Sequence, residues 1–190
     1  DGTIKAEGDY EVGDIGKSGD WKYYDRNGNL TLKESFKDGF QVGREESYYT
    51  SGQLEEYVDY SDEGLLEGYS ESYFKDGKIA NHGYYKSGQA DGEWLYYRND
   101  GTLSRSSFYS GGNLVGKAVS NAVNGRPWTI DTYRDQQVIS IAYCDTLGNI
   151  YESFDLDTGT VVLDQHDVYG NLKCKRTYVN YEASGTWLYY

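Results

Sequence analysis

Gly19-Asp-Trp-Lys-Tyr-Tyr-Asp-Arg-Asn-Gly-Asn-Leu30 decides the fold, because it returns as Gly92-Glu-Trp-Leu-Tyr-Tyr-Arg-Asn-Asp-Gly-Thr-Leu103. Each copy has a glycine, a tryptophan and two adjacent tyrosines, followed by Asn-Gly or Asp-Gly and then by a leucine. Aromatic residues are enriched in strands, and Asn-Gly and Asp-Gly favour hairpin turns. The stretch therefore predicts a strand, a tight turn and the start of a second strand.

The pattern repeats along the chain at intervals of 22 to 26 residues. The turn glycines are Gly2, Gly28, Gly52, Gly77, Gly101, Gly125, Gly148 and Gly170. A large apolar residue or proline follows two residues later, and an aromatic residue or leucine follows eight residues later. A second glycine series opens the preceding strand: Gly19, Gly43, Gly68, Gly92, Gly116 and Gly185. A third series marks the loop after the second strand: Gly39, Gly64, Gly88, Gly112 and Gly159.

This repeat predicts an all-β protein, an elongated single-sheet meander of stacked hairpins with strands of about seven to nine residues. Both central residues of each Asn-Gly or Asp-Gly turn are expected to have positive φ. We expect one array of seven to eight repeats over residues 1–190. Its approximate units are 1–18, 19–42, 43–67, 68–91, 92–115, 116–139, 140–162, 163–184 and a partial unit, 185–190.

Alternation assigns side chains to the two faces of the sheet. Leu30, Leu32 and Phe36 share one side of their strand, and polar residues occupy the other side. The middle of the apolar side is small or polar in several repeats: Gly8, Glu34, Gly83 and Ser107. Such a sheet has a thin core, so each repeat gains its stability mostly by packing on its neighbours.

The amino-acid composition argues against several classes of protein. Leu, Ile, Val and Phe total 36 of 190 residues and the net charge is −13, but 22 tyrosines and 4 tryptophans supply further apolar area. The negative charge argues against nucleic acid or an anionic membrane surface as partner. No apolar run approaches the roughly 18–20 residues of a membrane span. No phosphate loop, nucleophile elbow or Cys-x-x-Cys is present, so we expect neither an enzyme nor a cofactor.

Both ends of the sequence cut through a repeat. Asp1-Gly2 is a turn without its first strand, Gly185–Tyr190 is a strand without its turn, and there is no methionine. We expect a mature or excised fragment whose flanking repeats were removed, or whose terminal strand pairs with another chain. We also expect a secreted, periplasmic or cell-surface location in preference to a cytoplasmic one.

The two quoted stretches resemble the bacterial MORN-repeat variant family: glycine, tryptophan, paired aromatics, Asn/Asp-Gly, leucine, then an aromatic and a loop glycine. The resemblance covers nearly the whole chain and is cleanest over residues 16–116. Later units depart from it, since Asn121 replaces an aromatic residue and the loop after Tyr178 lacks its glycine. The resemblance implies a β-hairpin scaffold for protein contacts, a family label of antitoxin component, and no catalytic residues.

The alternative is a cell-surface carbohydrate-binding module, because the repeats that bind choline or glucan also use Trp-Tyr-Tyr and Asp-Gly. Both readings lead to an exposed aromatic face that occurs in some repeats and not in others. Its residues are Trp21, Tyr23, Trp94, Tyr96, Trp187 and Tyr189. Sugar stacking or a protein hot spot would use such a face. The same residues could instead supply extra packing where the sheet bends or ends.

Other candidate sites are weak. Asp157-Thr158-Gly159 matches the aspartic-protease tripeptide, but Gly159 occupies a repeat loop position and no second tripeptide completes a dyad. A calcium site is conceivable at the densest acidic segment, although an EF-hand spacing is absent: Asp155, Asp157, Asp164 and Asp167. We expect no metal there and interpret the segment as a solvated hairpin.

The histidines and cysteines predict no joint chemistry. His82 and His166 lie three repeats apart, and His82 is expected to face solvent from the polar side of its strand. Cys144 and Cys174 would be three strands apart in a simple meander, about 14 Å at ~4.8 Å per strand. Because a disulfide needs Cα atoms within about 7 Å, two free thiols are predicted.

Overall fold

The computed structural model describes residues 4–10, 16–156, 161–166, 172–179 and 182–189. All the helices and strands assigned among these residues are β-strands, so the predicted all-β class is confirmed. Two compact units make up the chain, Asp1–Gly101 (unit 1) and Thr102–Tyr190 (unit 2). No helix long and apolar enough to cross a membrane occurs in the described ranges.

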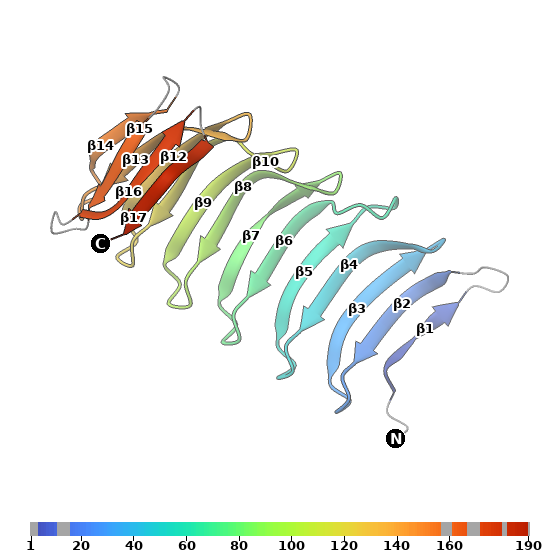
Figure 1. The fold of residues 1–190 in the computed structure, drawn as a ribbon. Helices are drawn as coiled ribbons and strands as arrows, with labels where there is room; N and C mark the ends of the chain where they lie inside the picture. The colour runs from blue at the N-terminus through green and yellow to red at the C-terminus, as the bar shows by residue number, and fades with distance from the viewer. Residues whose placement is uncertain (1–3, 11–15, 157–160, 167–171, 180–181, 190) are drawn as a thin grey trace. The chain divides into compact units, whose positions relative to one another are not determined.

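Unit 1 is an antiparallel meander in which each strand pairs with the next one along the chain (Figure 1). Its first four strands are β1 (Ala6–Tyr10), β2 (Lys17–Tyr24), β3 (Leu30–Lys37) and β4 (Phe40–Tyr48). The next four are β5 (Leu54–Tyr60), β6 (Gly68–Tyr73), β7 (Ile79–Lys86) and β8 (Gln89–Tyr97). The hairpin meander predicted from the repeat is therefore confirmed in unit 1.

Unit 2 contains the later strands of the meander, β9 to β14, and a separate small sheet. These later strands are β9 (Leu103–Ser110), β10 (Asn113–Leu114), β11 (Gly116–Asn121), β12 (Pro127–Arg134), β13 (Gln137–Cys144) and β14 (Ile150–Asp155). Among them, β9 pairs with both β10 and β11, and β11 to β14 then pair in sequence order. Beyond β14 the strands form a three-stranded sheet of their own: β15 (Val161–His166), β16 (Leu172–Val179) and β17 (Glu182–Tyr189). The prediction of a single sheet therefore does not extend to the end of unit 2.

The Asn-Gly and Asp-Gly turns of the first glycine series differ from the predicted geometry. Gly28 has a φ of 83°, but Asn27 is not among the four described non-glycine residues with positive φ. The amide of Gly28 donates to the carbonyl of Asp25 at 3.0 Å, and the amide of Asp25 donates to the carbonyl of Asn29 at 2.9 Å. These bonds define a three-residue loop in which only the glycine is left-handed. The prediction of two positive φ angles is therefore wrong for the turns of the first glycine series, although it holds for the Asp-Gly turn at Asp38-Gly39.

Turns with two positive φ angles occur instead at the opposite ends of the hairpins. Asp38 and Gly39 have φ values of 51° and 80°, and they join β3 to β4 in a two-residue loop. Ser87 and Gly88 have φ values of 50° and 83° and join β7 to β8 in the same way. Gly39 and Gly88 of the third glycine series therefore lie in two-residue turns, where glycine takes a left-handed conformation at little cost. Asp135 and Gln136 form a similar turn between β12 and β13 without a glycine.

Glycines of the second series create β-bulges inside the strands. Gly92 has a φ of 78°, and the residues from Gly92 to Trp94 face the single residue Gly83 between the pairs Tyr84–Asp91 and His82–Leu95. A bulge bends its strand and changes the direction of the neighbouring side chain. The bulge at Gly92 thereby places Trp94 across Gly83 on the adjacent strand.

Both cysteines are free, as predicted, but for a different geometric reason. Cys144 ends β13 of the meander and Cys174 lies in β16 of the small sheet. Each side chain is buried, with 2% of its surface exposed. The separation by three strands of one sheet is therefore wrong, although the prediction of free thiols is confirmed.

The close approach of Trp94 to Gly83 gives a test by substitution. We expect Gly83→Ala to lower the free energy of unfolding by about 1–3 kcal/mol, because its new methyl group would lie 2.2 Å from the indole ring. Ser70 is the cross-strand partner of Gly83, and its buried hydroxyl has no hydrogen-bond partner. Ser70→Ala should leave the stability within about 0.5 kcal/mol of the wild type or raise it, because an unsatisfied hydroxyl is removed. Urea denaturation measures both changes, and equal effects would contradict this packing.

The thiols provide a second test. Burial raises the pKa of the Cys144 thiol, with a smaller contribution from Asp145, so little reactive thiolate forms at neutral pH. A disulfide-exchange reagent should titrate two thiols per chain in denaturant and react far more slowly with the native protein. Fewer than two thiols in denaturant, or an equally fast native reaction, would contradict the structure.

Candidate functional site

The register of unit 1 assigns the central residue of each strand to one of two faces. One face carries a row that runs across the strands, which we call the tryptophan face. Its members are Gly8, Trp21, Glu34, Glu45, Val58, Ser70, Gly83 and Trp94. The row contains Trp21, Glu45, Ser70 and Trp94, which are positions predicted to vary between aromatic and polar residues.

The tryptophans of this face are buried, which contradicts the predicted exposed aromatic face. Trp21 and Trp94 expose only 7% and 6% of their surfaces. A Cβ atom at Gly8 would lie 2.3 Å from the ring of Trp21, and one at Gly83 would lie 2.2 Å from the ring of Trp94. Each indole therefore packs on the bare backbone of the adjacent strand. The alternative interpretation, extra packing, fits these two residues.

Hydrogen bonds and neighbouring rings complete the packing of the tryptophans. Nε1 of Trp94 donates to the carbonyl of Tyr84 at 3.2 Å, and Nε1 of Trp21 donates to backbone carbonyls at the same distance. Partly buried tyrosines lie beside them: the ring centroids are 6.3 Å apart for Trp21 and Tyr23, and 6.4 Å apart for Trp94 and Tyr96. These two tyrosines thus belong to the same packed clusters.

Lys17 covers one of these clusters. Its Nζ lies 5.0, 4.9 and 4.6 Å from the ring centroids of Trp21, Tyr23 and Phe36. Nζ also lies 3.8 Å from a carboxylate oxygen of Glu34 and donates to the hydroxyl of Tyr23. A cation held over three rings is a favourable arrangement, so this lysine belongs to the packing of the tryptophan face.

The opposite face of unit 1 carries a second aromatic group, which we call the tyrosine cluster. Its members are Tyr57, Tyr69, Tyr73, His82, Tyr84 and Tyr97, with the carboxylate of Glu71 among them. Tyr69 is central, because its ring centroid lies 6.3 Å from that of Tyr57, 5.5 Å from that of His82 and 5.2 Å from that of Tyr84. Four strands, β5 to β8, contribute to the cluster.

Unlike the tryptophans, the tyrosine cluster is accessible. Tyr84 exposes 56% of its surface, and the remaining members are half-buried. His82 lies on the polar side of its strand, as predicted. Its side chain is half-buried and does not point freely into solvent, because the ring stacks on that of Tyr97 with centroids 5.8 Å apart. Its Nε2 also lies 3.2 Å from the hydroxyl of Tyr97. The histidine is therefore part of the cluster.

Hydrogen bonds hold the tyrosines in place. The hydroxyl of Tyr69 donates to Glu71 at 2.9 Å, and that of Tyr73 donates to the other oxygen of the same carboxylate. Burial, followed by the hydrogen bond to Glu71, raises the pKa of both Tyr69 and Tyr73. Both hydroxyls therefore remain protonated donors at neutral pH. A carboxylate can accept about four hydrogen bonds, so Glu71 retains acceptor capacity for a further donor.

Arg44 borders the tyrosine cluster. Its guanidinium lies 4.1 Å from the ring centroid of Tyr57. Its Nε and one terminal nitrogen donate to the two carboxylate oxygens of Asp59 at 2.8 and 2.9 Å. A guanidinium on an aromatic ring with a two-pronged carboxylate contact is the favoured way of holding arginine. The cluster therefore contains one arginine site that its own chain already fills.

Sequence reasoning missed the tyrosine cluster because it concentrated on tryptophan. The signal is the alternation in Tyr69-Ser70-Glu71-Ser72-Tyr73, which places serines on one face and two tyrosines with a glutamate on the other. Tyr57 and Tyr84 align with this group across the strands. Reading every strand for both faces would have found it.

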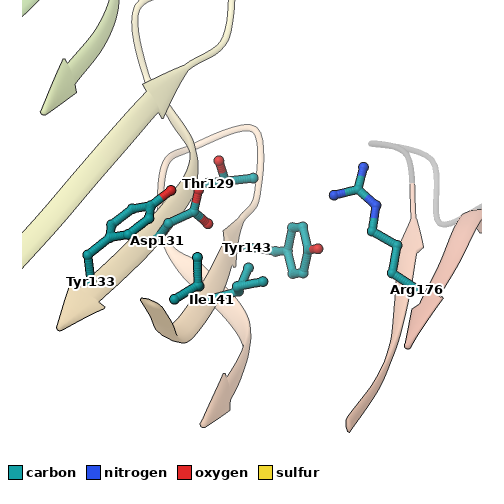
Figure 2. Close-up of a pocket in the computed structure, with 7 residues that line it drawn as sticks. Thr129, Asp131, Tyr133, Ile141, Tyr143 and Arg176 are labelled. Carbon is teal, nitrogen blue, oxygen red and sulfur yellow. The ribbon is translucent and has the colours of Figure 1, made fainter. Parts of the chain in front are cut away.

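Unit 2 contains a small polar cavity of about 190 Å³. Figure 2 shows Arg176 of β16 on one side of Tyr143, with Thr129, Asp131 and Tyr133 of β12 on the other side. Burial raises the pKa of the Asp131 carboxyl, and Arg105 and Arg176 oppose that shift. The cavity is smaller than the roughly 300–1,000 Å³ of drug-sized ligand pockets.

The remaining sequence candidates contribute no assembled site. Trp187 and Tyr189 lie in β17, but their side chains lie outside the described part of the structure. The Asp157-Thr158-Gly159 tripeptide and Asp167 also lie outside it. Asp155 ends β14, Asp164 lies in β15 and His166 ends that strand. Within the described ranges, no three His, Cys, Asp or Glu residues are grouped so that they could hold a metal ion.

Comparison with known families and proteins gives one match. Residues 17–38, 41–62 and 66–87 each match the family described as MORN repeat variant. The matched segments begin 24 and 25 residues apart, which equals the spacing of Gly28, Gly52 and Gly77. No curated protein matches the chain. Three consecutive segments of unit 1 are therefore similar to the MORN repeat variant.

Proposed function

We propose that this chain is a non-enzymatic binding protein that contacts a partner protein through the tyrosine cluster. The family match supports a repeat-based binding or scaffold module. The accessible aromatic group on β5 to β8 carries the proposal, because it lies within or next to the matched repeats and packing on the sheet leaves it partly exposed. Tyrosine and arginine are enriched at the centres of protein interfaces.

The arrangement of the cluster suits binding. Regular strands position its rings, and Glu71 and His82 restrain three tyrosine hydroxyls. Side chains that are already ordered lose less conformational entropy when a partner binds. The exposed edge of Tyr84 would then provide apolar contact area, and the surrounding polar groups would provide orientation.

The carbohydrate alternative has less support in unit 1. Stacking on a sugar requires an accessible aromatic face, whereas Trp21 and Trp94 pack against glycine backbone. The antitoxin role implied by the family resemblance remains a prediction, which the identity of a partner would test.

The proposed function can be tested with two exposed aromatic residues of unit 1. Tyr84, in the cluster, exposes 56% of its surface, and Phe40, which lies at the start of β4 outside the cluster, exposes 57%. Wild type, Tyr84→Ala and Phe40→Ala would be immobilised separately and exposed to extracts of the source organism. We expect at least one protein to be retained by wild type and Phe40→Ala and about tenfold less by Tyr84→Ala.

Thermal unfolding of the three proteins serves as the control, because exposed substitutions normally change stability by less than about 0.5 kcal/mol. If wild type and both variants retain every extract protein equally, the proposed role of the tyrosine cluster is refuted. Retention of polysaccharide without protein would favour the carbohydrate alternative.

A further inference from the structure

We propose that the tyrosine cluster recognises arginine side chains on a basic, extended segment of the partner. This inference rests on the proposed function and specifies the chemistry of the partner. It starts from Arg44, whose guanidinium stacks at 4.1 Å on Tyr57 while forking to Asp59. The face thus already holds one arginine by a combination of ring and carboxylate.

A second carboxylate among aromatic rings, that of Glu71, lies further along the same face. Glu71 lies opposite both Tyr57 and His82 in the strand register, and Tyr69 and Tyr73 donate to it. In the part of the chain that the structure describes, no lysine or arginine forms an ion pair with Glu71. An incoming guanidinium could therefore reach the free acceptor positions of Glu71 and lie against the neighbouring rings.

The repeat shows why the site lacks its own arginine. Arg44 directly follows a bulge glycine, and the equivalent residues of the flanking repeats are Asp20, Tyr69 and Glu93. Within unit 1, the position that is arginine in one repeat is thus a tyrosine or an acid in the others. An arginine supplied by a partner would complete in β6 to β8 the arrangement that Arg44 makes with β5.

Charge complementarity supports a basic partner. Residues 1–101 contain 22 Asp and Glu and 11 Lys and Arg, a net charge of −11 out of −13 for the whole chain. Such a field attracts cationic segments and accelerates their association. Arginine is favoured over lysine, because its planar guanidinium stacks on rings and donates to both oxygens of a carboxylate.

The test uses defined peptides instead of an unknown partner. The peptides fluorescein-(Gly-Arg)4-amide and fluorescein-(Gly-Lys)4-amide, each with the dye on its N-terminal amine, would be titrated with the full chain, with fluorescence anisotropy as the readout. We expect the arginine peptide to bind at least about threefold more tightly than the lysine peptide. Raising the salt concentration should weaken the binding of both peptides. The preference for arginine should persist, because salt does not screen the stacking of a guanidinium on an aromatic ring.

A matched pair of variants separates a local site from general attraction. Glu71→Gln and Glu56→Gln remove the same charge, and Glu56 lies on the other face as the cross-strand partner of Ser72. Glu71→Gln should lower the affinity for the arginine peptide about tenfold, and Glu56→Gln should lower it less than about twofold. Tyr84→Ala, at an exposed position, should weaken it about threefold or more without changing the melting temperature.

Equal effects of Glu71→Gln and Glu56→Gln, equal affinity for the two peptides, or no binding would overturn the inference. The proposed function would survive these results if a protein partner is still lost from Tyr84→Ala in the capture experiment. Conversely, displacement of that partner by the arginine peptide, but not by the lysine peptide at the same concentration, would support the inference.

Discussion

The contact between a tryptophan ring and the bare backbone of a glycine on the next strand is the constraint on which unit 1 depends. Trp21, Val58 and Trp94 are the buried apolar residues among the described residues of this unit. A sheet with so few buried side chains can remove a large ring from water only by laying it flat across its own strands. Gly8 and Gly83 permit this, since any side chain there would occupy the space of the ring. The tryptophans are thus packed on one face, while the tyrosine cluster on the other face stays partly exposed.

This division explains the different states of the two aromatic groups. The indole N–H groups of Trp21 and Trp94 bond to backbone carbonyls of the chain itself, as a buried polar group requires. The hydroxyls of Tyr69 and Tyr73 bond to a carboxylate that retains capacity for another donor. The first arrangement is complete within the chain, whereas the second leaves acceptor capacity on Glu71.

Much of the fold could be predicted from the sequence, because glycine positions and alternation act locally. The period of the turn glycines predicted the meander, and the alternation placed Trp21, Glu45, Ser70 and Trp94 on one face. The turn type at Gly28 was missed because the dipeptide does not specify the loop length. The separate sheet of β15 to β17 was missed because the repeat continues in the sequence while the strand pairing changes.

The candidate site was less predictable, because burial depends on the neighbouring strand. Trp21 and Trp94 follow strands with a central glycine, whereas the equivalent Glu45 and Ser70 follow strands with Glu34 and Val58. This correlation within the chain could have indicated packing in place of exposure. The tyrosine cluster needed the register of β5 to β8 as well, since its members come from four strands.

The most direct test of the division between the two faces is a nuclear magnetic resonance titration of the chain with the arginine peptide. Ring resonances of Tyr57, Tyr69, His82 and Tyr84 should shift on binding. The indole N–H resonances of Trp21 and Trp94 should stay in place. Shifts of these indole resonances, with the tyrosine cluster unchanged, would contradict the assignment of packing to one face and recognition to the other.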